Sequence, residues 1–219
     1  MLTIDIITIF PGLFDSFLNE SLVKKAIGKK LLNVKAWDLR DFTTDKHRTV
    51  DDRPYGGGPG MIFKIEPLAK ALKKILGPEF TKRKKTTRVL LLDPAGKQFD
   101  QRSAEQCSKL KHLVLIAGRY EGFDDRIRHY VDGAISVGPY VLNGGEVAAM
   151  AVIEATFRLI PGALGHADSA KEETHMSEGF VEYPQYTRPE VFDKKRVPDI
   201  LLSGDHKKIQ AWRGQNKKK

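Results

Sequence analysis

The chain has 219 residues, 41% of them hydrophobic, and this composition suits one globular domain with a small appendage. Its longest apolar runs are far shorter than the roughly 20 residues that span a bilayer, and its start lacks a secretion-signal pattern, so we expect a cytoplasmic protein without membrane contact. The single cysteine, Cys107, excludes an intrachain disulfide and a cysteine-cluster zinc site.

The formal net charge of +9 indicates a polyanionic partner, because Lys and Arg neutralise phosphates and release counterions from nucleic acid. Much of this charge lies in residues 188–219, where ten basic residues outnumber four acidic ones. A second basic cluster, residues 82–85 with Arg88, precedes an apolar run. That cluster fits either nucleic-acid contact or a solvated loop.

Apolar periodicity predicts alternating strands and helices along most of the chain. In chain order we expect a strand over 2–10, a helix over 13–30 with Asp15 or Asn19 as a cap, and a strand over 34–39. A helix over 67–76 follows, then a strand over 88–92, a turn over 93–96, a helix over 100–111, strands over 113–117 and 134–137, and a long helix over 144–160. This alternation predicts the α/β class with a mostly parallel sheet.

Residues 40–60 show no periodicity, carry many charges and end in four glycines and two prolines. A structureless loop of about twenty residues is uncommon in a compact domain and is usually functional. We therefore expect this loop to take part in binding.

The helix and strand pattern stops after Arg158. We interpret residues 161–172, which are small, polar and punctuated by Gly and Pro, as a linker between a domain over 1–160 and a small basic helical domain over 173–219. Short helices are expected over 189–193 and 206–213. About fifty residues hold little core, so we expect this domain to fold against a partner.

Three glycine turns stand directly behind apolar runs, at residues 118–122, 138–140 and 144–145. Glycine lets a ligand approach the backbone, and ligands of open α/β sheets lie beyond the carboxyl ends of strands. The region 113–150 is therefore the candidate binding site. The alternative is that these are ordinary turns of an α/β domain.

Several familiar motifs are absent. The chain has no Gly-x-x-x-x-Gly-Lys-Ser/Thr, no Gly-x-Gly-x-x-Gly after the first strand and no Gly-x-Ser-x-Gly, which argues against a P-loop nucleotidase, a dinucleotide site and a serine hydrolase. Its six histidines lack metal-ligand spacing. Any chemistry must then rely on carboxylates, arginines and backbone groups.

Four motifs together are specific: GRYEG at 118–122, SVGPYVLNGGE at 136–146, DDRPYGGGPGM at 51–61 and YPQYTRPEV at 183–191. With them, the chain resembles the bacterial tRNA (guanine(37)-N1)-methyltransferases of the TrmD type, in the SPOUT class, as far as about Arg213. The resemblance implies a deep trefoil knot, an obligate homodimer and methyl transfer from S-adenosyl-L-methionine to N1 of the tRNA guanosine that follows the anticodon. General topology rules would have argued against a knot.

The resemblance also implies site residues. The guanosine loop would comprise Asp51, Asp52, Arg53, Gly58, Pro59 and Gly60. The cofactor pocket would comprise Leu91, Leu92, Asp93, Pro94, Gly118, Tyr120, Glu121, Gly122, Ser136, Val137, Gly138, Pro139, Tyr140, Val141, Leu142, Gly144 and Gly145.

For catalysis the family uses a carboxylate that removes the N1 proton and an arginine that stabilises charge on O6. The arginine matches Arg158. The alternative role of Arg158 is that of a solvated arginine at the end of a helix, where it interacts favourably with the helix dipole. Where the family often has Asp-Ser-Phe, this chain has glutamates, so we choose Glu173 as the base and keep Glu172 as the alternative. Both glutamates could also be solvated linker residues. A requirement for Mg²⁺ is implied, without a dedicated site in the sequence.

Two other functions stay open. One is methylation of another RNA position, such as a ribose hydroxyl, and the other is RNA binding without catalysis through the basic tail. In either case Lys194, Lys195, Arg196, Lys207, Lys208 and Arg213 would contact phosphates, and Tyr183 and Tyr186 would stack on bases or pack in a core.

Overall fold

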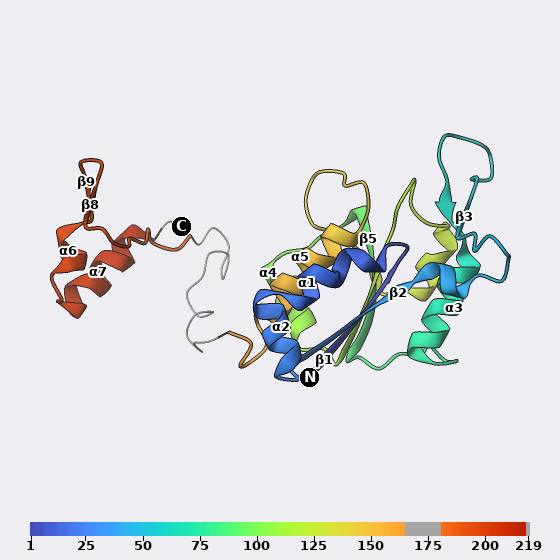
Figure 1. Cartoon of the computed structure of the whole chain (residues 1–219), viewed down its shortest axis with the longest axis horizontal. Helices are drawn as coiled ribbons and strands as arrows, with labels where there is room; N and C mark the ends of the chain where they lie inside the picture. Colours follow the sequence, from blue (N-terminus) through green and yellow to red (C-terminus); the bar gives the residue numbers. More distant parts are fainter. Residues whose placement is uncertain (165–180, 218–219) are drawn as a thin grey trace. The chain divides into compact units, whose positions relative to one another are not determined.

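The structure is a computed structural model that describes residues 1–164 and 181–217. The chain divides into two compact units, with the boundary between these two ranges (Figure 1). Among the helices of the two ranges, none has the length and apolar character that a bilayer crossing requires.

A five-stranded parallel sheet forms the centre of the first unit. Its strands lie in the spatial order β2-β1-β6-β5-β7, and every neighbouring pair runs parallel. The predicted α/β class with a mostly parallel sheet is therefore confirmed. The strands are β1 (Leu2–Thr8), β2 (Leu32–Asp38), β5 (Thr87–Gln98), β6 (His112–Ala117) and β7 (Gly133–Ser136).

The core lies on both faces of this sheet. In β6, Leu113 and Leu115 pack into one apolar cluster, whereas Val114 and Ile116 pack into the other. All four are buried, as expected for a parallel strand covered on both faces. The first cluster includes residues of α2 (Ser21–Gly28), α4 (Gln101–Ser108) and α5 (Glu146–Phe157), and the second includes residues of α3 (Ile65–Leu76), so helices cover both faces (Figure 1).

The segment predicted as one helix over 13–30 is divided into three. Ser21 has a φ of 54°, and the preceding Glu20 is extended, so the backbone cannot continue as one α-helix. The predicted caps are wrong, because no side chain caps either α-helix here and Asn19 Nδ2 instead donates to the Asp15 carbonyl. The pieces are the 3-10 helix η1 (Pro11–Phe14), α1 (Asp15–Asn19) and α2.

The turn predicted over 93–96 is a bulge inside a longer strand. Ile135 of β7 pairs with both Leu92 and Lys97 of β5, so the four residues between them project from the ladder. Gly96 has no space for a side chain, because a Cβ there would lie 2.5 Å from the backbone nitrogen of Ile135. The strand then continues to Gln98, beyond the predicted end at residue 92.

The loop predicted over 40–60 contains more structure than expected. The 3-10 helix η2 (Leu39–Phe42) occupies its start. Strand β3 (Asp51–Asp52) pairs antiparallel with β4 (Ile62–Phe63), which makes the glycine-rich residues between them the tip of a hairpin.

The second unit contains a small hairpin and two helices. Residues 189–193 were predicted to be helical, but β8 (Val191–Phe192) pairs antiparallel with β9 (Lys195–Arg196). Between the strands, Asp193 and Lys194 have φ values of 47° and 60°, which suit a two-residue type I′ turn. The helices are α6 (Asp199–Leu202) and α7 (His206–Asn216), and α7 confirms the helix predicted over 206–213.

Aromatic side chains pack together in this second unit. The rings of Tyr183 and Tyr186 lie 6.5 and 6.4 Å from the ring of Trp212, between centroids. The Arg213 guanidinium lies over the Tyr183 ring at 5.0 Å. Of the two roles left open for these tyrosines, packing within the unit is therefore observed, and the half-exposed Tyr186 keeps a free surface.

Asp100 begins α4 as its N-cap. Its Oδ1 accepts hydrogen bonds from the Ser103 hydroxyl and the Ser103 backbone N–H, both at 2.7 Å. These bonds from Ser103 lower the pKa of Asp100 below its usual value.

We expect Asp100→Ala to lower the free energy of unfolding by about 1 kcal/mol at neutral pH, measured by urea denaturation. Because the folded-state pKa of Asp100 is lowered, its carboxylate stabilises the fold above the unfolded pKa of about 3.9, and this contribution disappears as pH falls through the folded pKa. The gap between variant and wild type should therefore shrink in acid. Asp100→Asn retains an oxygen cap, and an equal loss in both variants would contradict the capping role.

Candidate functional site

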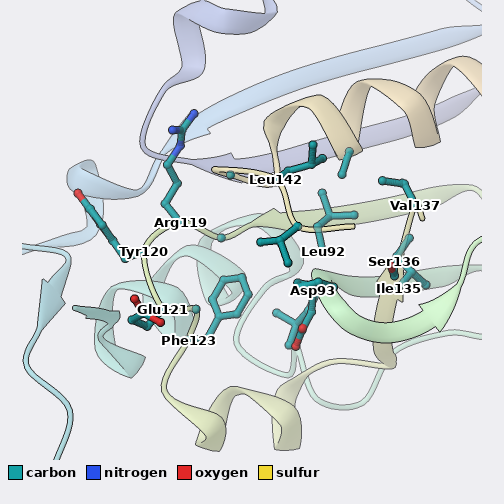
Figure 2. A pocket seen from close by; sticks show the side chains of 18 of the residues that line it. Leu92, Asp93, Arg119, Tyr120, Glu121, Phe123, Ile135, Ser136, Val137 and Leu142 are labelled. Atoms are coloured by element: carbon teal, nitrogen blue, oxygen red, sulfur yellow. The ribbon is translucent and has the colours of Figure 1, made fainter. Parts of the chain in front are cut away.

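A cavity of about 320 Å³ opens at the bulge of β5, at the carboxyl ends of β6 and β7 and beside the start of α5. Leu92 comes from β5, Gly118 follows β6 directly, and Ser136 ends β7. Figure 2 shows side chains from these separate elements converging on one space. Parallel α/β sheets bind their ligands at this edge.

The cavity brings together the residues assigned to the cofactor pocket, with two exceptions. All of those seventeen residues line it apart from Gly138 and Pro139. Gly138 packs against the Tyr140 ring, since a Cβ at this position would collide with it. The Ser136 hydroxyl donates to the Gly138 carbonyl at 2.9 Å, so this turn is held by its own hydrogen bonds.

Close backbone packing explains the glycines that form the cavity wall. A Cβ on Gly145 would lie 2.8 Å from the Cα of Ala117, and a Cβ on Gly118 would collide with the Phe123 ring. The Gly145 N–H donates to the Gly118 carbonyl at 2.8 Å. The turn after β6 and the start of α5 are therefore joined directly through backbone.

A buried ion pair fixes the same two segments. The Glu146 side chain is 1% exposed, and its Oε2 lies 3.0 Å from Nη2 and 3.1 Å from Nε of Arg119. Its Oε1 accepts a hydrogen bond from the Thr8 hydroxyl at 2.8 Å. The Arg119 guanidinium also lies 4.5 Å from the centre of the Phe10 ring. Three segments, the end of β1, the turn after β6 and the start of α5, thus share one carboxylate.

The GRYEG turn contains a strained residue. Tyr120 has a φ of 61°, a left-handed conformation that bulky residues rarely adopt. The Gly122 N–H donates to the Arg119 carbonyl at 3.2 Å, and the Tyr120 ring packs edge-on against Phe63 at 5.8 Å. Strain of this kind costs about 1–3 kcal/mol and is concentrated at functional sites.

The β3–β4 hairpin is attached to the cavity wall. The Glu121 N–H donates to the Met61 carbonyl at 3.0 Å, and the Phe63 N–H donates to the Gly122 carbonyl at 2.9 Å. A Cβ on Gly60 would lie 2.5 Å from Cγ of Glu121. Of the residues assigned to the guanosine loop, Gly60 therefore lies against the cavity wall. Asp51 and Asp52 form β3, while Arg53, Gly58 and Pro59 are exposed on the hairpin.

Of the residues assigned to catalysis, Arg158 does not line this cavity. Arg158 is the half-buried C-cap of α5, whereas the cavity lies at the other end of that helix. A helix of 12 residues is about 18 Å long. Glu173 and the alternative Glu172 lie outside the residues that the structure describes.

The family comparison matches residues 2–219 to the family described as tRNA (Guanine-1)-methyltransferase TrmD. Curated relatives named tRNA (guanine-N(1)-)-methyltransferase include those of Dictyoglomus turgidum, 51% identical, Lactiplantibacillus plantarum, 50% identical, and Pseudomonas fluorescens, 47% identical. The alignments cover 97%, 96% and 98% of this chain and 84%, 83% and 84% of the respective relatives.

The chain belongs to the TrmD family. The resemblance inferred from four short motifs is thereby confirmed over almost the full length.

The structure of this TrmD-family chain adds cavity residues to the seventeen that were assigned to the cofactor pocket. Arg128 Nη2 lies 3.0 Å from Oδ2 of Asp93, and Arg128 Nε lies 2.6 Å from Oδ1 of Asp125. Both hydrogen bonds raise the pKa of Arg128, and the bond with Asp125 has the larger effect. Asp93 and Arg128 are 35 positions apart, so no local pattern could have paired them. The other additions are Arg119, Phe123, Ile127, Ile135, Asn143 and Ala148.

We expect Glu146→Ala to lower the free energy of unfolding by roughly 3 kcal/mol, because it leaves the Arg119 guanidinium partly buried without its carboxylate. Glu154→Ala, which removes an exposed glutamate of the same helix, is the matched control and should cost far less. Urea denaturation measures both losses. Similar values for the two variants would show that the ion pair does not hold the cavity wall.

Proposed function

We propose that this TrmD-family protein is a tRNA (guanine-N1)-methyltransferase that transfers a methyl group from S-adenosyl-L-methionine to N1 of the guanosine following the anticodon. Family membership supports the activity. The structural observation that carries the proposal is the cavity built from glycine turns at the carboxyl edge of the parallel sheet.

The residues that line the cavity suit the chemistry of S-adenosyl-L-methionine. Leu91, Leu92 and Val137 offer apolar surface to an adenine ring. Gly118 and Gly145 have no space for a Cβ, so the wall there is bare backbone that a ligand can approach closely. The carboxylate of Glu121 lines the cavity and complements a positive charge. When bound, the cofactor supplies an electrophilic methyl group on its sulfonium sulfur.

For the transfer itself we propose Glu173 as the general base, with Glu172 as the alternative. N1 of guanine carries a proton, and its removal during attack makes N1 a better nucleophile, which contributes roughly 10²- to 10⁴-fold to the rate. Arg158 would stabilise the negative charge that develops on O6. These roles rest on the match to the family motifs.

We also propose the homodimer of the family. Arg158 and the cavity lie at opposite ends of α5, so a second copy of the chain is needed to bring an Arg158 to each cavity. Apolar residues beside the cavity support such a contact, since Val141 is 81% exposed and Val147 of α5 is 61% exposed.

A SPOUT-class trefoil knot is proposed for the first unit on the basis of the family. The chain after β7 returns to the turn after β6, where Gly145 and Gly118 are hydrogen-bonded and Arg119 bridges Gly144. A trefoil knot requires the chain to return to an earlier segment in this way, because one segment must pass through the loop that another forms.

We propose that the domain over 1–160 binds the cofactor and that the domain over 173–219, beyond the linker at 161–172, binds tRNA. Within the described part of that domain, Lys194, Lys195, Lys207 and Lys208 are exposed and available to phosphates.

For Mg²⁺ we assign no ligand, because residues 1–164 and 181–217 contain no group of three His, Cys, Asp or Glu side chains suited to a metal. Binding through phosphate or substrate oxygens is the proposed alternative.

The methylated position is tested by incubating the protein with unmodified tRNA and labelled cofactor, followed by digestion of the RNA. We expect N1-methylguanosine as the labelled nucleoside. Label in a ribose methyl group would instead favour the alternative RNA position. RNA binding without cofactor binding in calorimetry would favour the non-catalytic alternative.

We expect Glu173→Ala to slow single-turnover transfer by roughly 10²- to 10⁴-fold while leaving the calorimetric affinity for S-adenosyl-L-methionine nearly unchanged, because the base does not hold the cofactor. Glu172→Ala is the neighbouring control and should stay active. Full activity of Glu173→Ala with loss in Glu172→Ala would transfer the role to Glu172.

A further inference from the structure

One large aromatic side chain of the first unit has no packing role. Tyr55 is fully exposed, with a relative accessibility of 102%, although buried rings usually contribute strongly to stability. It stands at the tip of the β3–β4 hairpin, in a turn closed by a hydrogen bond from the Gly57 N–H to the Pro54 carbonyl at 3.2 Å. Gly56 has a φ of 86°, as the third residue of a type II turn requires.

The glycines after Tyr55 keep its surroundings open. At Gly56, Gly57 and Gly58 an added Cβ would meet nothing within 4 Å. A protein partner normally buries a patch of some 800 Å² per side, with apolar side chains at its centre. These glycines provide no such patch, whereas one isolated ring is sufficient to stack on one nucleobase.

The base of the hairpin is firmly placed relative to the cavity. Phe63 of β4 is buried and exchanges backbone hydrogen bonds with the turn after β6, donating to Gly122 at 2.9 Å and accepting from Asp124 at 2.9 Å. Gly60, five residues after Tyr55, touches Glu121 of the cavity wall. The ring is therefore carried on a short arm that starts at the cavity.

Positive charge lies close to the ring. Arg53, two residues before Tyr55, is exposed. Arg126 of the 3-10 helix η3 (Asp125–Tyr130) follows Asp124, whose N–H donates to Phe63 at the base of the hairpin at 2.9 Å. The Arg126 side chain is 67% exposed and is hydrogen-bonded to Asp124, which raises its pKa. An aromatic ring flanked by arginines is the usual combination for binding an unpaired nucleotide.

We propose that Tyr55 stacks on a nucleobase of the anticodon loop next to the guanosine that enters the cavity, and so stabilises the loop after that guanosine has left the stack. The inference rests on the proposed function. A base removed from its stack loses contact with its neighbour, and a tyrosine ring replaces that contact for any base, because every base has a π face. Arg53 and Arg126 then lie where the adjoining phosphates carry negative charge.

The test compares four variants of the full-length protein: Tyr55→Phe and Tyr55→Trp, which keep an aromatic face, and Tyr55→Leu and Tyr55→Ala, which remove it. Steady-state kinetics on unmodified tRNA should show KM for tRNA raised about tenfold to a hundredfold in the Leu and Ala variants and nearly unchanged in the Phe and Trp variants. The affinity for S-adenosyl-L-methionine, measured by calorimetry, should be equal in all of them.

A direct reporter of stacking is tRNA with 2-aminopurine next to the target guanosine. Wild type and Tyr55→Trp should quench its fluorescence on binding, whereas Tyr55→Leu should not. Equal KM and equal quenching in wild type and Tyr55→Leu would overturn the proposal. A change in sedimentation of Tyr55→Leu without a change in quenching would also overturn it, since the ring would then belong to a contact between protein chains.

The outcome is separable from that of the proposed function. If wild type forms no N1-methylguanosine, the proposed function fails irrespective of Tyr55. If wild type forms it and Tyr55→Ala performs equally well at low tRNA concentration, the activity stands and only the stacking role is lost.

Discussion

The buried carboxylate of Glu146 is the contact on which the cavity depends. A charge that is almost completely removed from water is tolerated only when it is paired and hydrogen-bonded, and Arg119 and Thr8 supply that pairing. Each partner comes from a different segment, so satisfying one charge fixes the end of β1, the turn after β6 and the start of α5 together. Gly144 follows from the same constraint, because a Cβ there would lie 2.5 Å from both Arg119 Nε and Glu146 Oε2.

This arrangement offsets the usual weakness of a glycine-rich wall. Glycine loses more conformational freedom on folding than any other residue, so loops made from it are costly to order. Here the glycines are ordered by contacts that a side chain would prevent, such as that of Gly145 with Ala117. The wall is bare enough for a ligand to touch the backbone and is still held in one conformation.

Apolar pattern was sufficient to predict the central strands but not the details that shape the cavity. The run 113–117 has no polar residue and was found as β6. By contrast, Asp93 and Pro94 indicate a turn locally, and only pairing with Ile135 shows that β5 resumes after them. The β8–β9 hairpin was missed because its turn lacks the usual glycine signal. Its two left-handed residues are Asp193 and Lys194.

Only those parts of the site that lie within short, continuous sequence motifs could be predicted from the sequence. Family motifs supplied the glycine turns, most of which line the cavity. The contact between Arg119 and Glu146 joins positions 27 apart, and that between Asp93 and Arg128 joins positions 35 apart, so each depends on the completed fold. Glu173 was assigned from a motif alone, and it lies outside the residues that the structure describes.

The arginine–carboxylate pairs around the cavity also change what the net charge of the chain means. Arg119 and Arg128 each face a carboxylate at 3.0 Å, so their charges are fixed, directional and largely balanced at short range. The exposed lysines of the second unit carry flexible, hydrated charge that is free to follow a phosphate chain. Around the cavity, paired guanidinium groups hold separate segments together, whereas the ammonium groups of the second unit provide a diffuse positive field that salt can screen.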